Sequence, residues 1–431
     1  MSFTRMSFTH RRNTARSTPR LMAAVAALVV VALVAAACGS SGSGGTGSTA
    51  TSGGASSGDG KSPVSTGNSP RTGASDAELA AAKALVQQWY APLPPSAFKG
   101  GTQLAKKPDI KGKTVYLVPL SYGIPVIHAF AVGVEQALTT LGAKYKVCDG
   151  GAGGQPNPTS WGNCLKTALD QRADAVMSMS IDYEADATQF DALAKAGIPT
   201  LIAAVQEKGL TPKPGLIDFF DLTGWTGTMW GNLSTLGLAE GGKNTGMLWL
   251  RLLDSTATTT ESDAGVAKFK QDCAACGIYT ADFTTANSQA QLAATVSAML
   301  VKHPDITVIA VPVDGYTPLA IQGIQQAGKT GKVQVVSSAG SLDTFQRIKD
   351  GTQIAALSSP NQFTGWLYTD ALMQLLAGMP VAKGNFGLMR AFDKSNINTI
   401  KLDSSQVLTD NWFTDGQPYI QGFLNAWGFG S

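Results

Sequence analysis

Histidine is scarce in this chain, and that scarcity argues against several kinds of active site. The 431 residues include three histidines, of which only His128 and His303 follow residue 38. Both belong to or border expected helices, so no pair of nucleophile and base is indicated. Neither of the two cysteine pairs has histidines beside it, which argues against a zinc site. We therefore expect a protein without enzymatic activity, metal or cofactor.

Charged residues are also few, at 15%, and the formal net charge of +3 is unevenly distributed. Five of the 33 Lys and Arg residues are arginines before residue 38, in a segment without Asp or Glu. The rest of the chain then holds 28 basic and 30 acidic residues. This near-neutral remainder, with no helix-turn-helix ahead of the α/β region, argues against nucleic-acid binding.

A phosphate-binding loop is missing as well. The glycine-rich stretch GGAGG at 150–154 follows an expected strand, as such loops do. It lacks the Gly-Lys-Ser/Thr ending of a P-loop and the GxGxxG spacing of a dinucleotide site. We interpret it as a flexible turn.

The amino-terminal arginines precede an unbroken apolar run at 21–37, which ends in small residues before Cys38. This layout is typical of a secretory signal peptide, predicted here over residues 1–37. An uncleaved anchor is the alternative, although the run is shorter than the roughly 20 residues that a membrane-spanning helix needs. The stretch LVAAACG at 33–39 resembles a bacterial lipobox, so we expect Cys38 to carry the lipid.

A tether is predicted after Cys38, over 38–75, because residues 39–75 consist almost wholly of Gly, Ser, Thr and Ala. Such a segment has too little apolar surface to offset the entropy of ordering it. As a flexible coil it would span roughly 35 Å. It could hold a folded domain away from a membrane without fixing its orientation.

The folded part is expected to begin with a helix from Asp76, capped by Ser75 or Asp76 and followed by an extended arm to residue 111. Beyond it, short β-branched runs alternate with amphipathic helices, which is typical of βαβ units and parallel sheets. The pattern occurs twice in series. Strands are expected at about 113–120, 144–148, 174–179 and 198–204, then at 246–251, 278–283, 306–312, 333–338 and 353–358.

Several stretches in this register carry a family resemblance. They are GVEQALTTLG at 133–142, ADAV at 173–176, AGIP at 196–199 and KHPDITVI at 302–309. With them, the chain from about 111 to 404 resembles a type I periplasmic binding protein of the sugar-binding group, the solute receptors of ABC importers. The resemblance implies an α/β fold of two similar Rossmann-like lobes, joined by a hinge of three crossings.

From the resemblance we expect crossings near 220–224, 357–361 and 395–398. The first lobe would comprise 112–221 and 361–396, and the second 222–360 and 397–409. The aromatic tail, 410–431, is expected to pack against the hinge. A small ligand, with sugars favoured, would bind between lobes that close upon it and pass to an ABC permease. The receptor is expected to be a lipid-anchored monomer outside the cell membrane.

Two other functions remain open at this point. One is a receptor for an aromatic, amino-acid-like or signalling ligand that serves a sensor kinase. The other is an exported thiol-redox or hydrolytic enzyme. Sugar receptors of the family often carry polar groups where this chain has Ala204, Val313 and Ala339, and buried sugar hydroxyls need polar partners. That departure favours a less hydroxylated or aromatic ligand.

Candidate ligand contacts are the polar and aromatic residues at the ends of the expected strands. Asp182 and Asp314 are alternatively helix caps. Tyr122 and Phe283 either stack on a ligand or pack within their lobes. Arg251 either binds a ligand carboxylate or pairs with Asp254. The full set is Ser121, Tyr122, Ser180, Asp182, Gln206, Asp221, Arg251, Asp254, Phe283, Asp314, Ser338 and Asn361.

The four remaining cysteines suit an exported protein. A bridge from Cys148 to Cys164 would close a loop of about 17 residues and add about 3 kcal/mol in the chain-entropy model. Cys273 and Cys276 have the spacing of a redox motif, but they follow a helix carboxyl end, where the helix dipole opposes a thiolate. A local disulfide or two free thiols is therefore favoured over redox chemistry.

Overall fold

The computed structural model describes residues 73–152, 155–205, 208–383 and 387–430. They lie in one compact unit, Asn68–Ser431. The predicted signal peptide, Cys38 and nearly all of the tether fall outside the described residues, as does Gln206. No helix among the described residues is both long and apolar enough to cross a membrane.

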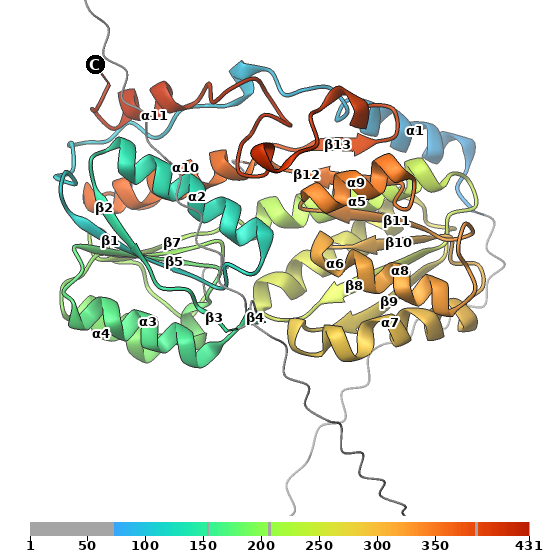
Figure 1. The fold of residues 1–431 in the computed structure, drawn as a ribbon, viewed down its shortest axis with the longest axis horizontal. Helices are drawn as coiled ribbons and strands as arrows, with labels where there is room; N and C mark the ends of the chain where they lie inside the picture. The colour runs from blue at the N-terminus through green and yellow to red at the C-terminus, as the bar shows by residue number, and fades with distance from the viewer. Residues whose placement is uncertain (1–72, 153–154, 206–207, 384–386, 431) are drawn as a thin grey trace, which may run out of the picture. The chain divides into compact units, whose positions relative to one another are not determined.

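The first lobe is built on a parallel sheet in the order β2-β1-β5-β6-β7 (Figure 1). Side chains alternate between its faces: Val115 and Leu117 join one hydrophobic cluster, and Tyr116 and Val118 join another. Helices cover both faces, which buries the inner strands. The strands are β1 Thr114–Pro119, β2 Lys144–Val147, β5 Ala175–Met179, β6 Thr200–Ala203 and β7 Ile217–Phe220.

Helices α2 and α10 pack together on one face of this sheet, and α3 packs with α4 on the other. A two-residue hairpin, β3 with β4, follows β2. The 3-10 helix η2, Tyr183–Ala185, follows β5. The bounds are α2 Pro125–Thr140, α3 Pro158–Asp170, α4 Ala187–Lys195, α10 Asn361–Leu376, β3 Gly151–Ala152 and β4 Gln155–Pro156.

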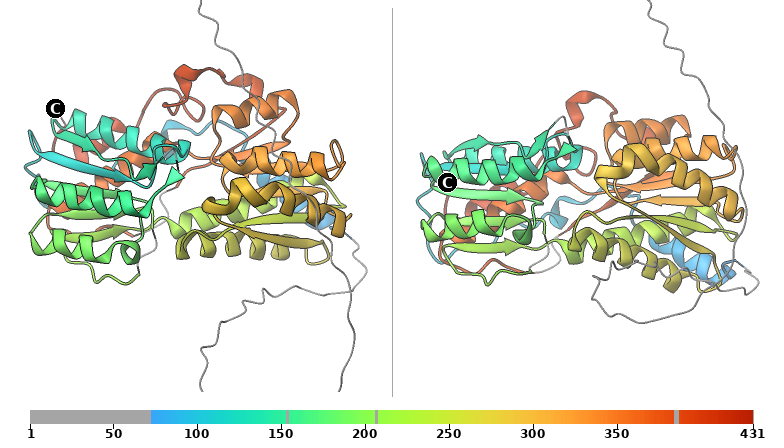
Figure 2. Two further views of the ribbon diagram at one scale, coloured as in Figure 1. Left: turned by 60° about the horizontal axis from the view of Figure 1, so that its bottom comes forward. Right: turned by 90° about the horizontal axis from the view of Figure 1, so that it is seen from below.

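The second lobe is built on a sheet in the order β13-β12-β11-β10-β8-β9, which is parallel except for β13. Helices α5 and α6 pack together on one face, and α7 and α8 cover the other (Figure 2). Its elements are α5 Thr223–Gly241, β8 Met247–Leu252, α6 Thr256–Asp272, β9 Ile278–Phe283, α7 Thr285–Lys302, β10 Val308–Val311, η3 Asp314–Tyr316, α8 Thr317–Gln326, β11 Gln334–Ser338, α9 Leu342–Asp350, β12 Ala355–Ser358 and β13 Arg390–Asp393.

Two parallel-sheet lobes flanked by helices confirm the predicted fold class, but one expected boundary differs. Residues 361–396 were expected in the first lobe, yet residues 390–393 of this range form β13, which pairs antiparallel with β12 of the second. At Val381 the chain still lies against the first lobe, because the Val381 N–H donates a hydrogen bond to Asp218 at 3.0 Å. The chain is therefore already part of the second lobe at Arg390, ahead of the crossing expected at 395–398. Because β13 has only four residues, its sequence shows no clear alternation of apolar and polar residues from which the strand could be predicted.

The amino-terminal arm runs from the second lobe to the first. Helix α1, Asp76–Gln87, begins with a capping box at Ser75 and packs against α5. Further along, Trp89 accepts a backbone hydrogen bond from Ala391 of β13 at 2.8 Å. Thr102 then reaches α10, donating its N–H to Asp370 at 2.9 Å. A 3-10 helix, η1 Pro95–Ala97, lies between these contacts.

The carboxyl-terminal tail packs against α10, the helix that follows the second crossing. Asp410 accepts hydrogen bonds from the first amides of that helix, including that of Phe363 at 2.9 Å. Farther on, Trp427 donates its indole N–H to Asp370 at 2.6 Å. The tail also pairs with the arm, because Leu104 donates to the Ala426 carbonyl at 3.1 Å. The elements of this region are η4 Ile397–Thr399, η5 Ser404–Gln406 and α11 Ile420–Ala426.

Candidate ligand-binding site

The backbone turns sharply at the carboxyl ends of strands in both sheets. Ser180, Ala204 and Ala339 directly follow β5, β6 and β11, with φ angles of 63°, 60° and 83°. Each still donates its N–H to a carbonyl at the end of the neighbouring strand. Left-handed backbone is uncommon outside glycine and costs of order 1–3 kcal/mol, and such residues cluster at functional sites. The strained positions therefore mark these strand ends as the candidate site.

Ser121 and Tyr122, which follow β1, are held within the first lobe. The buried Ser121 hydroxyl accepts the Gly123 N–H at 3.1 Å. The Tyr122 hydroxyl donates to Glu135 on α2 at 2.6 Å, and its ring lies 4.7 Å from that of His128. Burial and the Glu135 carboxylate raise the pKa of Tyr122. These contacts favour packing against α2 over a stacking platform for ligand.

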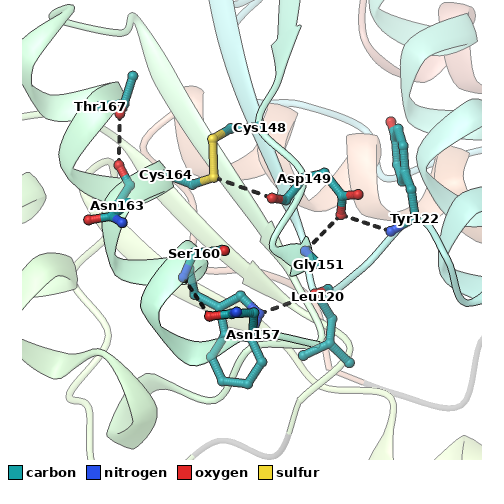
Figure 3. The surroundings of a disulfide bond; sticks show 11 residues. Leu120, Tyr122, Cys148, Asp149, Gly151, Asn157, Ser160, Asn163, Cys164 and Thr167 are labelled. Atoms are coloured by element: carbon teal, nitrogen blue, oxygen red, sulfur yellow. Dashed lines mark hydrogen bonds between the residues drawn. A yellow bond between two sulfur atoms is a disulfide. The ribbon is translucent and has the colours of Figure 1, made fainter. Parts of the chain in front are cut away.

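A disulfide fixes the neighbouring loops of the first lobe (Figure 3). Cys148 after β2 is bonded to Cys164 on α3, with 5.5 Å between their Cα atoms, as predicted. Beside it, Asp149 accepts hydrogen bonds from the backbone N–H groups of Tyr122 and Gly151, both at 2.9 Å. The ends of β1 and β2 are thus tied together through one carboxylate. The second pair, Cys273 with Cys276, is also a disulfide.

Three carboxylates, one each from the first lobe, the first crossing and the second lobe, interact electrostatically. Two are the predicted residues Asp182 and Asp221, and the third is Glu261 on α6. Burial raises the pKa of Glu261 to about 8; a hydrogen bond from Thr226 opposes the rise, and the charges of Asp221 and Asp182 add to it. We call Asp182, Asp221 and Glu261 the carboxylate cluster.

Asp182 does not cap the helical turn that follows it, because its side chain makes no cap hydrogen bond to η2. Burial raises its pKa, and Glu184 contributes, while Lys208 acts in the opposite direction. Such shifts are frequent at functional sites, where carboxylates are held away from water. The geometry thus favours the binding interpretation of Asp182 over the capping one.

Two buried hydroxyls adjoin the carboxylate cluster without a hydrogen-bond partner among the described residues: those of Tyr368 on α10 and Thr223 on α5. The Glu261 charge contributes to raising the pKa of Tyr368 well above its usual value, after burial. The backbone N–H of Thr223 donates to Asp221 at 2.7 Å. Both hydroxyls can therefore form a hydrogen bond with a ligand.

In the second lobe the loops after β8, β9 and β10 are joined through one threonine. Asp254 accepts the Thr285 N–H at 2.8 Å, and the Thr285 hydroxyl lies 2.5 Å from that of Tyr316. Phe283 is buried and meets the Tyr316 ring edge-on at 4.8 Å. Phe283 therefore packs within the lobe. Tyr316 is half-buried at this rim and was not among the predicted contacts.

Arg251 does not pair with Asp254, its expected partner within the protein. Its guanidinium donates to both carboxylate oxygens of Asp282, at 2.8 and 3.0 Å, and to Asp263 at 2.7 Å. Asp282 is the cross-strand neighbour of Arg251 in the β8–β9 register. Two carboxylates therefore compensate this cation, and Asp254 is bonded elsewhere. The Arg251 side chain is therefore held by ion pairs at the β8–β9 edge of the second sheet.

Asp314 and Asn361 lie together near the second crossing, and Ser338 ends the strand that pairs with β12. Asp314 accepts the Ser341 N–H at 2.6 Å and so joins the loop after β10 to the start of α9, rather than capping η3. The Ser338 hydroxyl donates to the Pro312 carbonyl. Asp314 and Asn361 line a cavity of about 30 Å³, which has room for a water-sized group.

That cavity is lined from both lobes, because the start of α2, the Ala339 turn and the tail also contribute to it. The predicted residues thus fall into separate groups. Asp182 and Asp221 form the carboxylate cluster with Glu261, and Asp314 and Asn361 share the cavity. Tyr122, Arg251 and Phe283 are engaged inside their own lobes.

Comparisons with known proteins agree with this architecture. The model of the periplasmic binding protein domain matches residues 115–380, more than half of the chain. The chain therefore belongs to the periplasmic binding protein family. Membership of this family implies that the chain is a receptor and that it lies outside the cytoplasm. The alternative of an exported enzyme therefore has no support. No curated protein matches the sequence.

Solved structures share the fold at low sequence identity. An ABC sugar transporter subunit from Rhodobacter sphaeroides is 16% identical with a TM-score of 0.54, covering 67% of this chain and 100% of its own. A periplasmic solute binding protein from Actinobacillus succinogenes with bound D-allose is 14% identical, with a TM-score of 0.56 and coverages of 67% and 100%. A 5-methylthioribose transporter protein from Thermotoga lettingae is 14% identical, with a TM-score of 0.55 and coverages of 75% and 95%.

Proposed function

We propose that this protein is an extracytoplasmic solute receptor that captures a small, sugar-like ligand between its lobes and delivers it to an ABC import permease. The electrostatic interaction of Asp182, in the first lobe, with Glu261, in the second, carries the proposal. A ligand that contacts both would bind closed lobes more tightly than open ones. The closed form would then be the one that the permease recognises.

The polar groups at this place support a hydroxylated ligand. Each buried sugar hydroxyl needs a hydrogen-bond partner, and carboxylates accept such bonds strongly. The carboxylate cluster and the Tyr368 and Thr223 hydroxyls offer partners. Structures with the same fold hold D-allose or 5-methylthioribose. We also propose two of the contacts predicted from the sequence. They are Ser180, which follows β5, and Asn361, which begins α10.

We propose that a lipid on Cys38 anchors the receptor, as a monomer, to the outer face of the cell membrane. The described chain starts on the second lobe, where Ala74 donates its N–H to the Lys243 carbonyl at 2.8 Å. Metabolic labelling with a fatty acid tests this, because label should appear in the full chain and disappear in Cys38→Ser.

A thermal-shift screen tests the receptor function, with the chain from residue 38 onward carrying Cys38→Ser. Sugars, polyols, aromatic acids and amino acids form the panel. A ligand at 100 times its dissociation constant should stabilise the protein by about 2.7 kcal/mol. Shifts from non-carbohydrates alone would overturn the sugar class. The absence of any shift would overturn the receptor itself.

A further inference from the structure

The amino-terminal arm, residues 88–111, and the carboxyl-terminal tail, residues 410–430, run along both lobes (Figure 1). They are bonded to each other where they meet, because Leu93 of the arm donates its N–H to the Phe413 carbonyl of the tail at 2.8 Å. We call these two segments together the brace. It adds two connections between the lobes to the crossings of the hinge.

Buried aromatic contacts attach the brace to the second lobe. Trp412 meets Phe345 on α9 edge-on, with 4.8 Å between the ring centroids. Phe413 meets Phe392 on β13 edge-on at 5.9 Å. All four side chains are buried. Because protein interiors are closely packed, the tail cannot slide over this lobe without opening its core.

The same run of the tail is attached to the first lobe. Tyr419 packs against Phe363 at the start of α10, with 5.1 Å between ring centroids, and stacks on Phe98 of the arm at 5.6 Å. Gln417 and Gln136 on α2 exchange hydrogen bonds through their amides, at 2.6 and 2.9 Å. The short run from 412 to 419 therefore contacts both lobes.

Arg390, at the start of β13, joins the arm to the tail. Its guanidinium donates to the Tyr90 carbonyl at 3.2 Å and to the Trp412 carbonyl at 2.5 Å. The side chain is buried, and burial lowers its pKa. A buried cation is costly unless its donors are hydrogen-bonded. Displacing either segment would therefore leave this cation without an acceptor.

The tail also lies between the lobes near the second crossing. Trp412 and Phe413 line the cavity of about 30 Å³ together with Val126 of the first lobe and Gly340 of the second. The space that remains there suits a water-sized group. A rotation that brought these two lobe surfaces together would press them against the tail.

We propose that the brace holds the two lobes at nearly one angle, so that the ligand-free receptor already populates the conformation that binds. Hinge closure in two-lobed proteins is absorbed by a few residues at the crossings. Here the same rotation would also have to shear the buried contacts of the brace. Affinity is reduced when the binding conformation is only a fraction of the population, and the brace would remove that loss.

This inference rests on the proposed function, because it describes how far the lobes move when they capture a ligand. Closure is then a small rotation. Its test needs no ligand, so a failure of the inference leaves the receptor function to be decided by the thermal-shift screen.

Distances between spin labels on the two lobes test the inference in the ligand-free protein. The chain from residue 38 onward would carry Cys38→Ser, with Lys195→Cys at the end of α4 and Lys302→Cys at the end of α7. Both lysines are exposed, and both disulfides are kept. Pulsed electron paramagnetic resonance should give one narrow distance distribution. A broad distribution, or a second population, would overturn the inference.

A matched pair of variants separates the brace from general stability. Arg390→Met keeps the apolar stem but releases the arm and tail carbonyls, so it should widen the distance distribution roughly twofold. Arg347→Met is the control, because that partly buried guanidinium donates to Gln353 and Thr344, both in the second lobe. The control should lower the melting temperature without widening the distribution.

Trp412→Leu weakens the brace in a second way, by removing the contact with Phe345, and it should also widen the distribution. Circular dichroism identifies which variants are folded. A folded Arg390→Met or Trp412→Leu with the wild-type distribution would overturn the inference, since the crossings alone would then hold the lobes. If both variants unfold, the wild-type distribution decides.

Discussion

The indole of Trp427, four residues from the end of the chain, lies parallel to that of Trp366 on α10, with 5.7 Å between ring centroids and 7° between planes. Both side chains are buried. The Trp427 N–H also donates to Asp370 on the same helix. Trp427 is therefore part of the core beside the hinge.

Replacing Trp427 with Ala should lower the free energy of unfolding by about 3–5 kcal/mol, the usual cost of removing a buried tryptophan. Trp427→Phe keeps a ring but loses the hydrogen bond to Asp370, so it should cost less, about 1–3 kcal/mol. Denaturant unfolding followed by circular dichroism measures both. Equal and small losses would show that the tail contributes little to the core.

The carboxyl of Asp410 should make stability decrease as pH rises from about 4 to 6. Burial raises its pKa in the folded protein to about 6, against hydrogen bonds from Tyr419 and the first amides of α10. The folded state then binds more protons than the unfolded state in this window, and stability is lost as pH rises. The two-unit difference corresponds to about 3 kcal/mol.

The variant Asp410→Asn isolates this effect, because asparagine does not titrate. The free energy of unfolding of the variant minus that of the wild type should increase by about 3 kcal/mol between pH 4 and pH 7. Above pH 7 this difference should stay constant. Urea unfolding at half-unit pH steps gives the difference directly. A constant difference across this range would contradict the assignment.

Arg251→Met should weaken the fold without affecting ligand binding. The variant keeps the apolar stem but loses the hydrogen bonds to Asp263 and Asp282, and the guanidinium side chain is only 20% exposed. We expect a loss of about 1–3 kcal/mol in the free energy of unfolding. The shift in melting temperature on adding ligand should be unchanged. Loss of that shift would show that Arg251 contributes to ligand binding.

Ala339→Gly should stabilise the protein by up to about 1 kcal/mol. Glycine relieves the left-handed strain of 1–2 kcal/mol but adds about 0.5–1 kcal/mol of unfolded-state entropy. Ala203→Gly, at an extended position inside β6, is the matched control and should destabilise. Thermal unfolding of both variants checks the prediction. A lower melting temperature for Ala339→Gly would show that no strain is stored there.

The fold was largely predictable because buried strands such as β1 and β5 are continuous apolar runs between amphipathic helices. Strand β7, Ile217–Phe220, was missed, since four residues beside a loop carry no clear period. The partner of Arg251 depends on the register between β8 and β9, which no local pattern encodes.

The site was predictable only in part. Asp182 could be inferred because it follows an expected strand, and Asp221 because the family resemblance places it at the first crossing. Glu261 lies in the polar stretch TTTESD at 258–263, which indicates a solvated helix face. Its burial arises from the packing of α6 against α5 and from the neighbouring first lobe. Such a residue is found only once the elements are assembled.

The contacts of α10 also set an order for folding. This helix completes the face of the first sheet, although its residues follow most of the second lobe in the chain. Its first turn is capped by Asp410, and its side is covered by Trp427. The first lobe, encoded first, therefore cannot finish folding until the final residues have emerged from synthesis. A nascent chain that lacks them would expose the apolar side of α10, which is the condition under which chaperones engage a substrate.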